Sequence, residues 1–289
     1  MSTTPKVLIF FHIAKTAGTT LSNILGRNYA DDASISINYA EQLAELEHFK
    51  QLPACERAKI RYFHSHMMPF GIHQYLPPSF YVVMLRDPVE RVISEYYYIR
   101  RYQGHPLHQK ITTDNISLAE YVTSGINPAA AGNGQTRLLS GIPGVDWATG
   151  GGPVSEAVLR QSQENIKKFV ALVGFTEKFD ESLILLKQLL GWKNTDLLYQ
   201  KQNVTIGRPK QRDIPTATIK LIEQYNTLDI ELYQTALAQF DRTIAAQGPS
   251  FAMELEAFRL WNKLYNRLYE HRRIAVPIKQ MFLGTRKNK

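Results

Sequence analysis

The stretch VLIFFHIAKTAGTT, residues 7–20, joins an apolar run to a polar turn. Its first five residues are a short, continuous set of strand formers, which predicts a buried parallel strand. A helix is expected to follow from Thr19 to Leu25. Backbone N–H groups and the dipole of such a helix converge on the turn that precedes it. The sequence therefore predicts an anion site at this turn.

The residue types in the turn suit a phosphate-like ligand. Gly18 would let the backbone approach an oxyanion, and Lys15 supplies a mobile positive charge. The triphosphate loop G-x-x-x-x-G-K-[ST] is a different pattern, because here the lysine precedes the only glycine. The candidate ligands, which include three threonine hydroxyls, are Lys15, Thr16, Ala17, Gly18, Thr19 and Thr20.

A second strand-to-helix junction follows the apolar run FYVVML, residues 80–85. This run indicates a strand. Asp87 is a typical helix cap and Pro88 suits the first helical position, so a helix is expected over 89–101.

Arg86 then emerges at the carboxyl edge of the predicted sheet, where open α/β sheets bind their ligands. Its guanidinium can make two bonds to a phosphate, and the hydroxyl of Ser94, two turns into the helix, could reach the same anion. The alternative is a scaffold role, in which Arg86 pairs with Asp87 or Glu90.

Two histidines, His64 and His66, lie two positions apart at the end of a predicted strand, which is expected to include 60–63. Alternation along a strand points both side chains to one face. A histidine with a pKa of about 6.5 can accept the proton of an attacking hydroxyl, so the pair is a candidate for general-base catalysis. A structural pair and a metal pair are the alternatives. No third ligand has suitable spacing, so no metal is expected.

The remaining pattern places these sites in one α/β domain, 1–289. A strand is expected at 169–174 and a helix at 179–190, and alternating strands and helices predict a three-layer, P-loop-like fold with a mainly parallel central sheet flanked by helices. The segment 125–153 is rich in glycine and is expected to be a loop that arches over a site or a surface insertion. The segment 240–289 is expected to be a helical extension, amphipathic over 251–269, with a basic tail.

Composition limits the remaining possibilities. The formal charge is +8, and residues 271–289 carry six Lys or Arg and no acidic residue, so they hold +6 and the remainder +2. Such a tail is either a solvated terminus or a contact for anionic partners such as a membrane surface. The single cysteine, Cys55, excludes an intramolecular disulfide and a cysteine-rich metal site. No apolar run approaches the roughly 20 residues of a membrane span, and no signal peptide is evident, so a cytoplasmic protein is expected.

Residues 10–21, FFHIAKTAGTTL, resemble the 5'-phosphosulfate loop of the sulfotransferases that use 3'-phosphoadenosine 5'-phosphosulfate (PAPS), in the branch that contains heparan sulfate 2-O-sulfotransferase. That branch usually has a proline where Ala14 stands. The segment 86–98, R-D-P-x-x-R-x-x-S-x-Y, looks like the 3'-phosphate segment of the same family. Residues 133–141 and 203–209 resemble two further segments, one on the floor of the site and one near the nucleotide.

The resemblance implies roles for individual residues. It implies that Arg86 and Ser94 bind the 3'-phosphate of PAPS and that Arg208 lies near the nucleotide. Lys15 would stabilise the leaving phosphate. The branch carries H-G-H where this chain has Ser65 between its histidines, so His66 is expected to be the base and His64 an assistant or a substrate ligand.

These observations predict a PAPS-dependent O-sulfotransferase. The sulfuryl group would pass by in-line displacement to a hydroxyl of a carbohydrate or glycoconjugate, such as a saccharide or a glycolipid, with no nucleic acid involved. Two alternatives remain open: an atypical P-loop kinase, which would need a triphosphate, and a non-catalytic binder of acidic polymer that uses the basic tail.

Overall fold

A computed structural model describes residues 6–38, 42–145, 151–200 and 208–283, without the side chains of 129, 130 and 270–283. The strands are β1 Val7–His12, β2 Ser34–Asn38, β3 Tyr62–His66, β4 Ser79–Leu85 and β5 Val170–Phe175. The α-helices are α1 Gly18–Gly26, α2 Leu43–Gln51, α3 Ala54–Arg57, α4 Pro88–Arg101, α5 His108–Thr113, α6 Leu118–Thr123, α7 Pro128–Ala131, α8 Gly134–Ser140, α9 Glu156–Phe169, α10 Phe179–Leu190, α11 Asn194–Leu197, α12 Thr216–Tyr225, α13 Thr227–Ala246 and α14 Pro249–Leu283. Short 3-10 helices are η1 Asp31–Ala33, η2 Ile72–Tyr75, η3 Thr176–Lys178 and η4 Gln211–Asp213.

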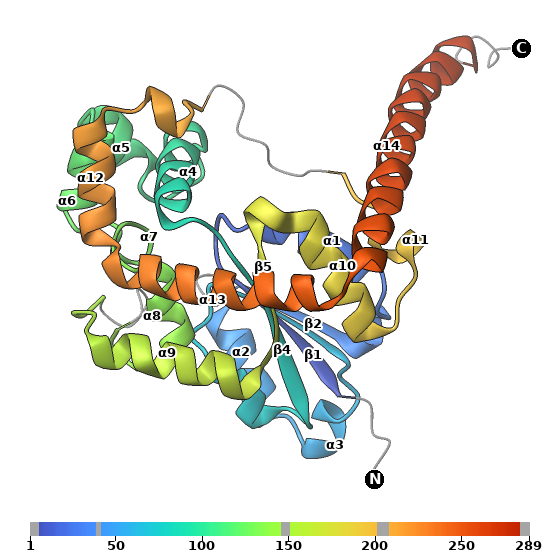
Figure 1. Ribbon diagram of the computed structural model, residues 1–289, viewed down its shortest axis with the longest axis horizontal. Coiled ribbons are helices and arrows are strands. Elements are labelled where there is room, and N and C mark those ends of the chain that lie inside the picture. The colour runs from blue at the N-terminus through green and yellow to red at the C-terminus, as the bar shows by residue number, and fades with distance from the viewer. Residues whose placement is uncertain (1–5, 39–41, 146–150, 201–207, 284–289) are drawn as a thin grey trace, which may run out of the picture.

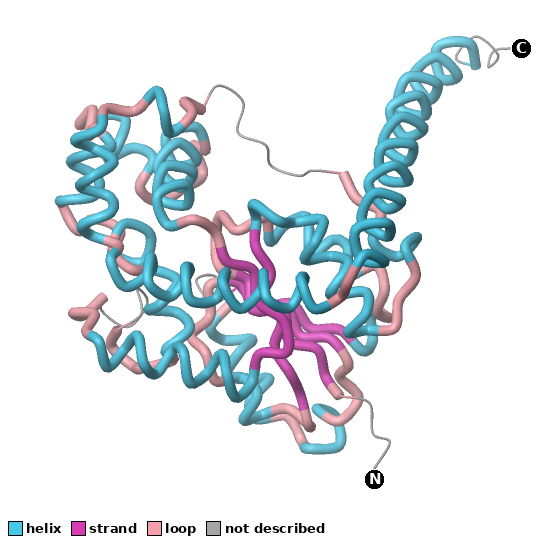
Figure 2. The backbone as a smooth tube through the Cα atoms, viewed as in Figure 1, coloured by secondary structure: helices cyan, strands magenta, loops and turns pink. Residues whose placement is uncertain are grey.

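The strands form one sheet in the order β2-β3-β1-β4-β5, and every neighbouring pair is parallel. Figure 2 shows this sheet in the middle of the molecule with helices around it. All six residues of β1 are buried, as expected for a central strand between two covered faces. The predicted α/β fold with a parallel central sheet is confirmed.

Two strands differ from the expectation. β3 runs from Tyr62 to His66 instead of over 60–63, and the two histidines lie at its end, as expected. β2 was not predicted, because its sequence, SISIN, alternates small polar residues with isoleucine and only Ile37 is buried. This is the pattern of an edge strand, which lacks the continuous apolar run of a central one.

The apolar residues form two clusters. One surrounds the sheet, and the other lies among α4, α5, α6, α7 and α12, which form the separate helical group in Figure 1. At the other side of the molecule α14 is fixed by Phe251, Leu255 and Phe258 and then projects from the body. It contains the predicted amphipathic helix and extends beyond it, while 284–289 of the predicted basic tail lie outside the described residues. Within the described part of the chain, no helix has the length and apolar character needed to cross a membrane.

The glycine-rich segment 125–153 is only partly the loop that was expected, since its described residues outside two short helices are loop. It contains α7 and α8, and every residue of α8 is buried, so this part is neither an arch nor a surface insertion. The reason is that the carboxylate of Asp229 on α13 accepts hydrogen bonds from the backbone N–H groups of Gln135 and Thr136 and so draws α8 into the interior. Residues 146–150 lie outside the described part.

The sheet order locates a crevice. The chain leaves β1 toward β2 on one side and leaves β4 toward β5 on the other, although β1 and β4 are neighbours. Ligands of open α/β sheets bind where neighbouring strands diverge in this way, beyond their carboxyl ends. The two predicted anion sites follow these two strands.

Candidate active site

The turn after β1 has an unusual backbone. Lys15 and Ala17 both adopt left-handed conformations, with φ of 69° and 61°, although neither is glycine. Each such residue costs on the order of 1–3 kcal/mol, and such costs cluster at binding sites. Alternating left- and right-handed residues aim successive N–H groups into one concavity that suits an anion. The predicted phosphate turn therefore has a suitable backbone.

The side chain of Thr16 has a different role from the predicted one. Its hydroxyl donates to the carbonyl of Ile13 at 2.8 Å, and the residue is fully buried. The hydroxyl hydrogen is thus used to close the turn and not to bind a ligand. Thr19 and Thr20 lie in the first turn of α1, where Thr20 is buried and Thr19 is exposed.

Gly18 is needed for a reason that the sequence did not predict. A Cβ at this position would overlap the imidazole of His12, at Nε2, Cδ2 and Cε1. Gly18 does not have a positive φ, so the requirement is space and not backbone conformation. The close neighbour of this glycine is a histidine at the end of β1.

The ammonium of Lys15 lies 3.8 Å from the centre of the Tyr98 ring on α4. The pKa of Lys15 is lowered to about 8, chiefly by burial and also by the positive charges of Arg86, Arg101 and Arg208, whereas Glu95 opposes this shift. The pKa of Glu95 is itself raised by burial. A cation held among other cations is poised to bind an anion.

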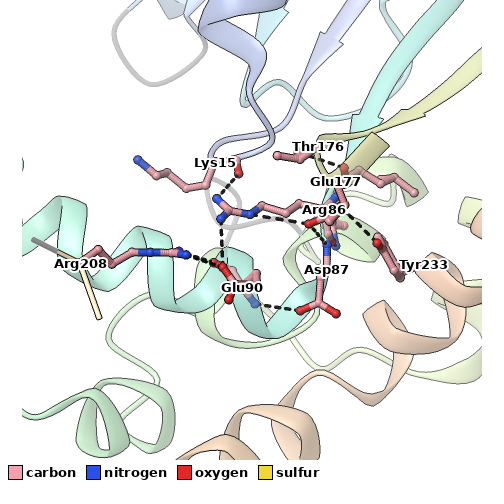
Figure 3. Close-up of polar contacts among 10 residues, drawn as sticks. Lys15, Arg86, Asp87, Glu90, Thr176, Glu177, Arg208 and Tyr233 are labelled. Carbon is pink, nitrogen blue, oxygen red and sulfur yellow. Dashed lines mark hydrogen bonds and ion pairs between the residues drawn. The ribbon is translucent and has the colours of Figure 1, made fainter. Parts of the chain in front are cut away.

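Arg86 and Arg208 meet at one carboxylate. Both guanidiniums pair with Oε2 of Glu90, at 3.2 Å and 2.5 Å, and Arg86 also donates to the carbonyl of Lys15 at 3.0 Å (Figure 3). The structure therefore brings together Lys15, Arg86 and Arg208. The scaffold alternative for Arg86 is partly correct, since it does pair with Glu90, but Asp87 instead caps α4 by accepting the N–H of Glu90.

Arg86 retains a donor for a ligand. Its Nε is buried and makes no hydrogen bond within the described part of the chain, and the nearest acidic oxygen, on Glu177, is 4.0 Å away. A buried donor without a partner is costly, and an anion that reached it would satisfy it. This donor fits a bound phosphate. Ser94 is buried further along α4.

The two predicted histidines belong to a group of three. His12 at the end of β1 is paired with His66 in the parallel register, and their rings meet edge to face with centroids 4.5 Å apart. Nδ1 of His12 lies 3.0 Å from Nε2 of His64. On β2, Ser36 Oγ lies 2.8 Å from Nδ1 of His64, and Asn38 Oδ1 lies 3.3 Å from Nδ1 of His66.

The segment 133–137 supports this site. The side chain of Gln135 holds Arg86 by both its backbone N–H, at 3.0 Å, and its carbonyl, at 2.9 Å. Arg137 donates to the carbonyls of Gly132, Val145 and Gly152. The contacts of Gln135 with Arg86 agree with the predicted place of this segment at the floor of the site. Residues 201–207 of the other predicted segment lie outside the described part.

Sequence reasoning missed His12 and Glu95. A signal for His12 was present, since it closes the same strand that leads into the turn. Glu95 gave none, because a carboxylate on a helix is usually exposed. Among the described residues, no group of three His, Cys, Asp or Glu side chains is placed to hold a metal ion.

Comparison with known proteins agrees with this arrangement. Human galactose-3-O-sulfotransferase 3 is 29% identical over 264 residues, which cover 87% of this chain and 60% of that protein. The mouse protein of the same name is 28% identical over 266 residues, again 60% of its length. Heparan sulfate 2-O-sulfotransferase 1 of Gallus gallus is 24% identical over 254 residues, 81% of this chain and 70% of that protein. The chain thus spans about 60% of the length of the galactose-3-O-sulfotransferases that it matches.

The sequence profile of the galactose-3-O-sulfotransferase family matches residues 2–271. This match covers the anion-binding turn, the histidine group and the arginine pair. The resemblance to sulfotransferases that the motifs indicated is confirmed, and the chain belongs to the galactose-3-O-sulfotransferase family.

Proposed function

We propose that this protein is a carbohydrate O-sulfotransferase that moves a sulfuryl group from PAPS to a hydroxyl of a saccharide or glycoconjugate. One observation carries the proposal. After β1 and β4, the guanidinium of Arg86 contacts the backbone of Lys15 and shares Glu90 with Arg208, and histidines end the neighbouring strands β1 and β3. The names of the relatives, which include transfer to galactose and to heparan sulfate, support the same chemistry.

In this proposal, different residues bind the two phosphate groups of PAPS. The turn from Lys15 to Thr20 would hold the 5'-phosphosulfate, and Arg86 with Ser94 would hold the 3'-phosphate. Arg208 would lie near the nucleotide. Glu90 pairs with both arginines and leaves a net charge of about +1, so a bound phosphate would compete with Glu90 for them.

His66 is the general base in this proposal. Its Nδ1 lies 3.3 Å from Asn38 Oδ1, and a neutral His66 that donates there would present the lone pair of Nε2 to the acceptor hydroxyl. As the acceptor oxygen bonds to sulfur, its proton passes to Nε2, and the bond from sulfur to the 5'-phosphate oxygen breaks with its electron pair on that oxygen. Lys15 would stabilise this developing charge, an effect typically worth about 3–4 kcal/mol. Burial lowers the pKa of His64 to about 4, so His64 stays neutral, and its two ring nitrogens contact Ser36 and His12, which makes it an assistant of the site and not a substrate ligand in this proposal.

A transfer assay tests the proposal. Radiolabelled PAPS is offered with galactose-terminated oligosaccharides, heparan sulfate and a glycolipid, and the label should appear in at least one acceptor. Binding of adenosine 3',5'-bisphosphate is measured in parallel. A protein that binds ATP with magnesium and not the bisphosphate would instead be a kinase-like protein.

Two substitutions distinguish the role of the general base from the role of the donor-binding site. His66→Ala should retain affinity for adenosine 3',5'-bisphosphate and lower turnover by about 10²- to 10⁴-fold, the usual contribution of a general base. Arg86→Ala should weaken nucleotide binding instead. His48→Ala, an exposed histidine on α2, and Arg212→Ala, whose side chain is 76% exposed, are the matched controls and should change neither quantity. The reverse pattern for His66 and Arg86 would contradict these roles.

A further inference from the structure

The histidine that sequence reasoning missed is the most buried member of the group. His12 is only 8% exposed, and its ring stacks on Phe10 with centroids 5.3 Å apart. The ring of His64 stacks on the same phenylalanine at 5.4 Å and on His12 at 5.2 Å. Together with the 3.0 Å contact between His12 Nδ1 and His64 Nε2, this packing fixes the orientation of both rings. His12 is therefore held with its Nε2 in one place.

That place is the anion-binding turn. Nε2 of His12 is one of the atoms that a Cβ on residue 18 would overlap, so it lies against Gly18, the first residue of α1. The His12 ring also lies edge to face with His66, with centroids 4.5 Å apart. The imidazole is thus next to both the turn that would hold the 5'-phosphosulfate and the histidine that would take the acceptor proton. In the proposed function the sulfuryl group is bound at this turn, which Nε2 of His12 contacts.

The hydrogen bonds within the group allow two arrangements of protons. Burial lowers the pKa of His12 well below its usual value and that of His64 to about 4, so each ring is neutral and carries one N–H. In the first arrangement Ser36 donates to His64 and His64 donates to His12, which leaves the proton of His12 on Nε2. In the second, all donors reverse and Nε2 of His12 is an acceptor. An anion in the turn favours the first, because an N–H attracts it and a lone pair repels it.

We propose that His12 is a further ligand of the sulfuryl group, to which it donates Nε2–H, and that Ser36 and His64 fix the tautomer that makes this possible. The inference rests on the proposed function. It gives two adjacent histidines opposite roles: His66 presents a lone pair to the acceptor hydroxyl, and His12 presents a hydrogen to the group being transferred. His64 acts through His12 and is a positioning residue.

The test compares two nucleotides that differ by the sulfuryl group. Calorimetry without acceptor measures the affinity of wild-type protein and His12→Phe for PAPS and for adenosine 3',5'-bisphosphate. The variant should bind PAPS about 10- to 100-fold more weakly, the usual effect of losing a hydrogen bond to a charged group, and should bind the bisphosphate as the wild type does. His12→Gln, which keeps an N–H donor, should recover part of the loss. Equal losses for both nucleotides, or no loss for either, would overturn the proposal.

Two further measurements complete the test. ¹⁵N NMR of the PAPS complex should show His12 protonated on Nε2 and not on Nδ1, and the opposite tautomer in that complex would refute the donor role. Gly18→Ala should destabilise the wild type, because the new Cβ meets the His12 ring, and should be tolerated when His12→Ala removes that ring. Gly26→Ala, with open space at the last residue of α1, is the control. A wild type that binds neither nucleotide would instead count against the proposed function.

Discussion

Lys15 combines two features that are each unfavourable for folding. Its backbone is left-handed, and its ammonium is buried against Tyr98 with its pKa lowered to about 8. Strain of this kind persists only where the surroundings enforce it, and here the Thr16 hydroxyl and the Arg86 guanidinium both bind carbonyls of the turn. Such costs are characteristic of a site prepared for a ligand that is not part of the fold.

The lowered pKa of Lys15 predicts a pH dependence for nucleotide binding. Because the pKa in the folded protein lies below the usual 10.5, Lys15 loses its charge as the pH rises through about 8, whereas a bound phosphate would raise the pKa again. Affinity for adenosine 3',5'-bisphosphate should therefore fall above about pH 8, by up to tenfold per pH unit, with uptake of one proton on binding. Calorimetry in buffers of different ionisation enthalpy measures this uptake.

Lys15→Arg is the matched control, since arginine keeps its charge throughout this range. Its binding should show no proton uptake and a flat pH profile above 8. Uptake that persists in Lys15→Arg would assign the titration to another group.

The position of a site residue could be predicted from the sequence where it depended on a single strand. Lys15 and Arg86 each follow a buried apolar run, so their place at the carboxyl edge of the sheet follows from their own segments. His12 required the pairing of β1 with β3, which brings it opposite His66 and is a property of the sheet order. The roles predicted for Ser94 and Arg208 remain predictions, although Arg208 does reach Glu90 beside Arg86.

At the scale of elements, α8 connects the interior to the site. Its first N–H groups bind Asp229 of α13, a fully buried residue that also lies 3.7 Å from the guanidinium of Arg91. From the same turn of α8, Gln135 holds the backbone of Arg86. One carboxylate on α13 thus determines, through α8, where Arg86 leaves β4.

Removing this carboxylate should be costly. Asp229→Ala leaves Arg91 buried beside an apolar side chain and two N–H groups without their acceptor, so we expect a loss of about 3–5 kcal/mol in the free energy of unfolding. Asp241→Ala on the same helix removes a half-exposed partner of Lys178 and should cost about 0–1 kcal/mol. Urea denaturation measures both. Equal effects of the two substitutions would contradict the role of Asp229.

Elements with strong local patterns were predicted well and the others were not. The helix expected at 179–190 has these bounds in α10, because its apolar spacing and burial agree. The segment 125–153 was misjudged because glycine frequency reports backbone freedom and carries no information about a distant acceptor such as Asp229. β2 was missed because an edge strand needs only one buried face, and SISIN buries a single isoleucine.

At the scale of the whole molecule, the site draws on regions far apart in the sequence. The sheet cluster supplies the turn after β1, and the helical group around α4 supplies Glu90, Ser94 and Tyr98. A nucleotide with phosphates at both ends of its ribose would bridge these two regions. The C-terminal half of α14 projects away from both (Figure 1).

This separation predicts that the basic tail is dispensable for transfer. Deleting 272–289 removes six cations, but the family match ends at residue 271 and α14 is fixed to the body by buried Phe251, Leu255 and Phe258. The shortened protein should keep its thermal midpoint, its affinity for adenosine 3',5'-bisphosphate and its turnover with a small neutral saccharide, all within about twofold because distant sites act independently. A polyanionic acceptor such as heparan sulfate should bind more weakly to it, and this loss should shrink as salt is raised. Loss of nucleotide binding on deletion would instead place the tail in the site and favour a protein that binds acidic polymers through it.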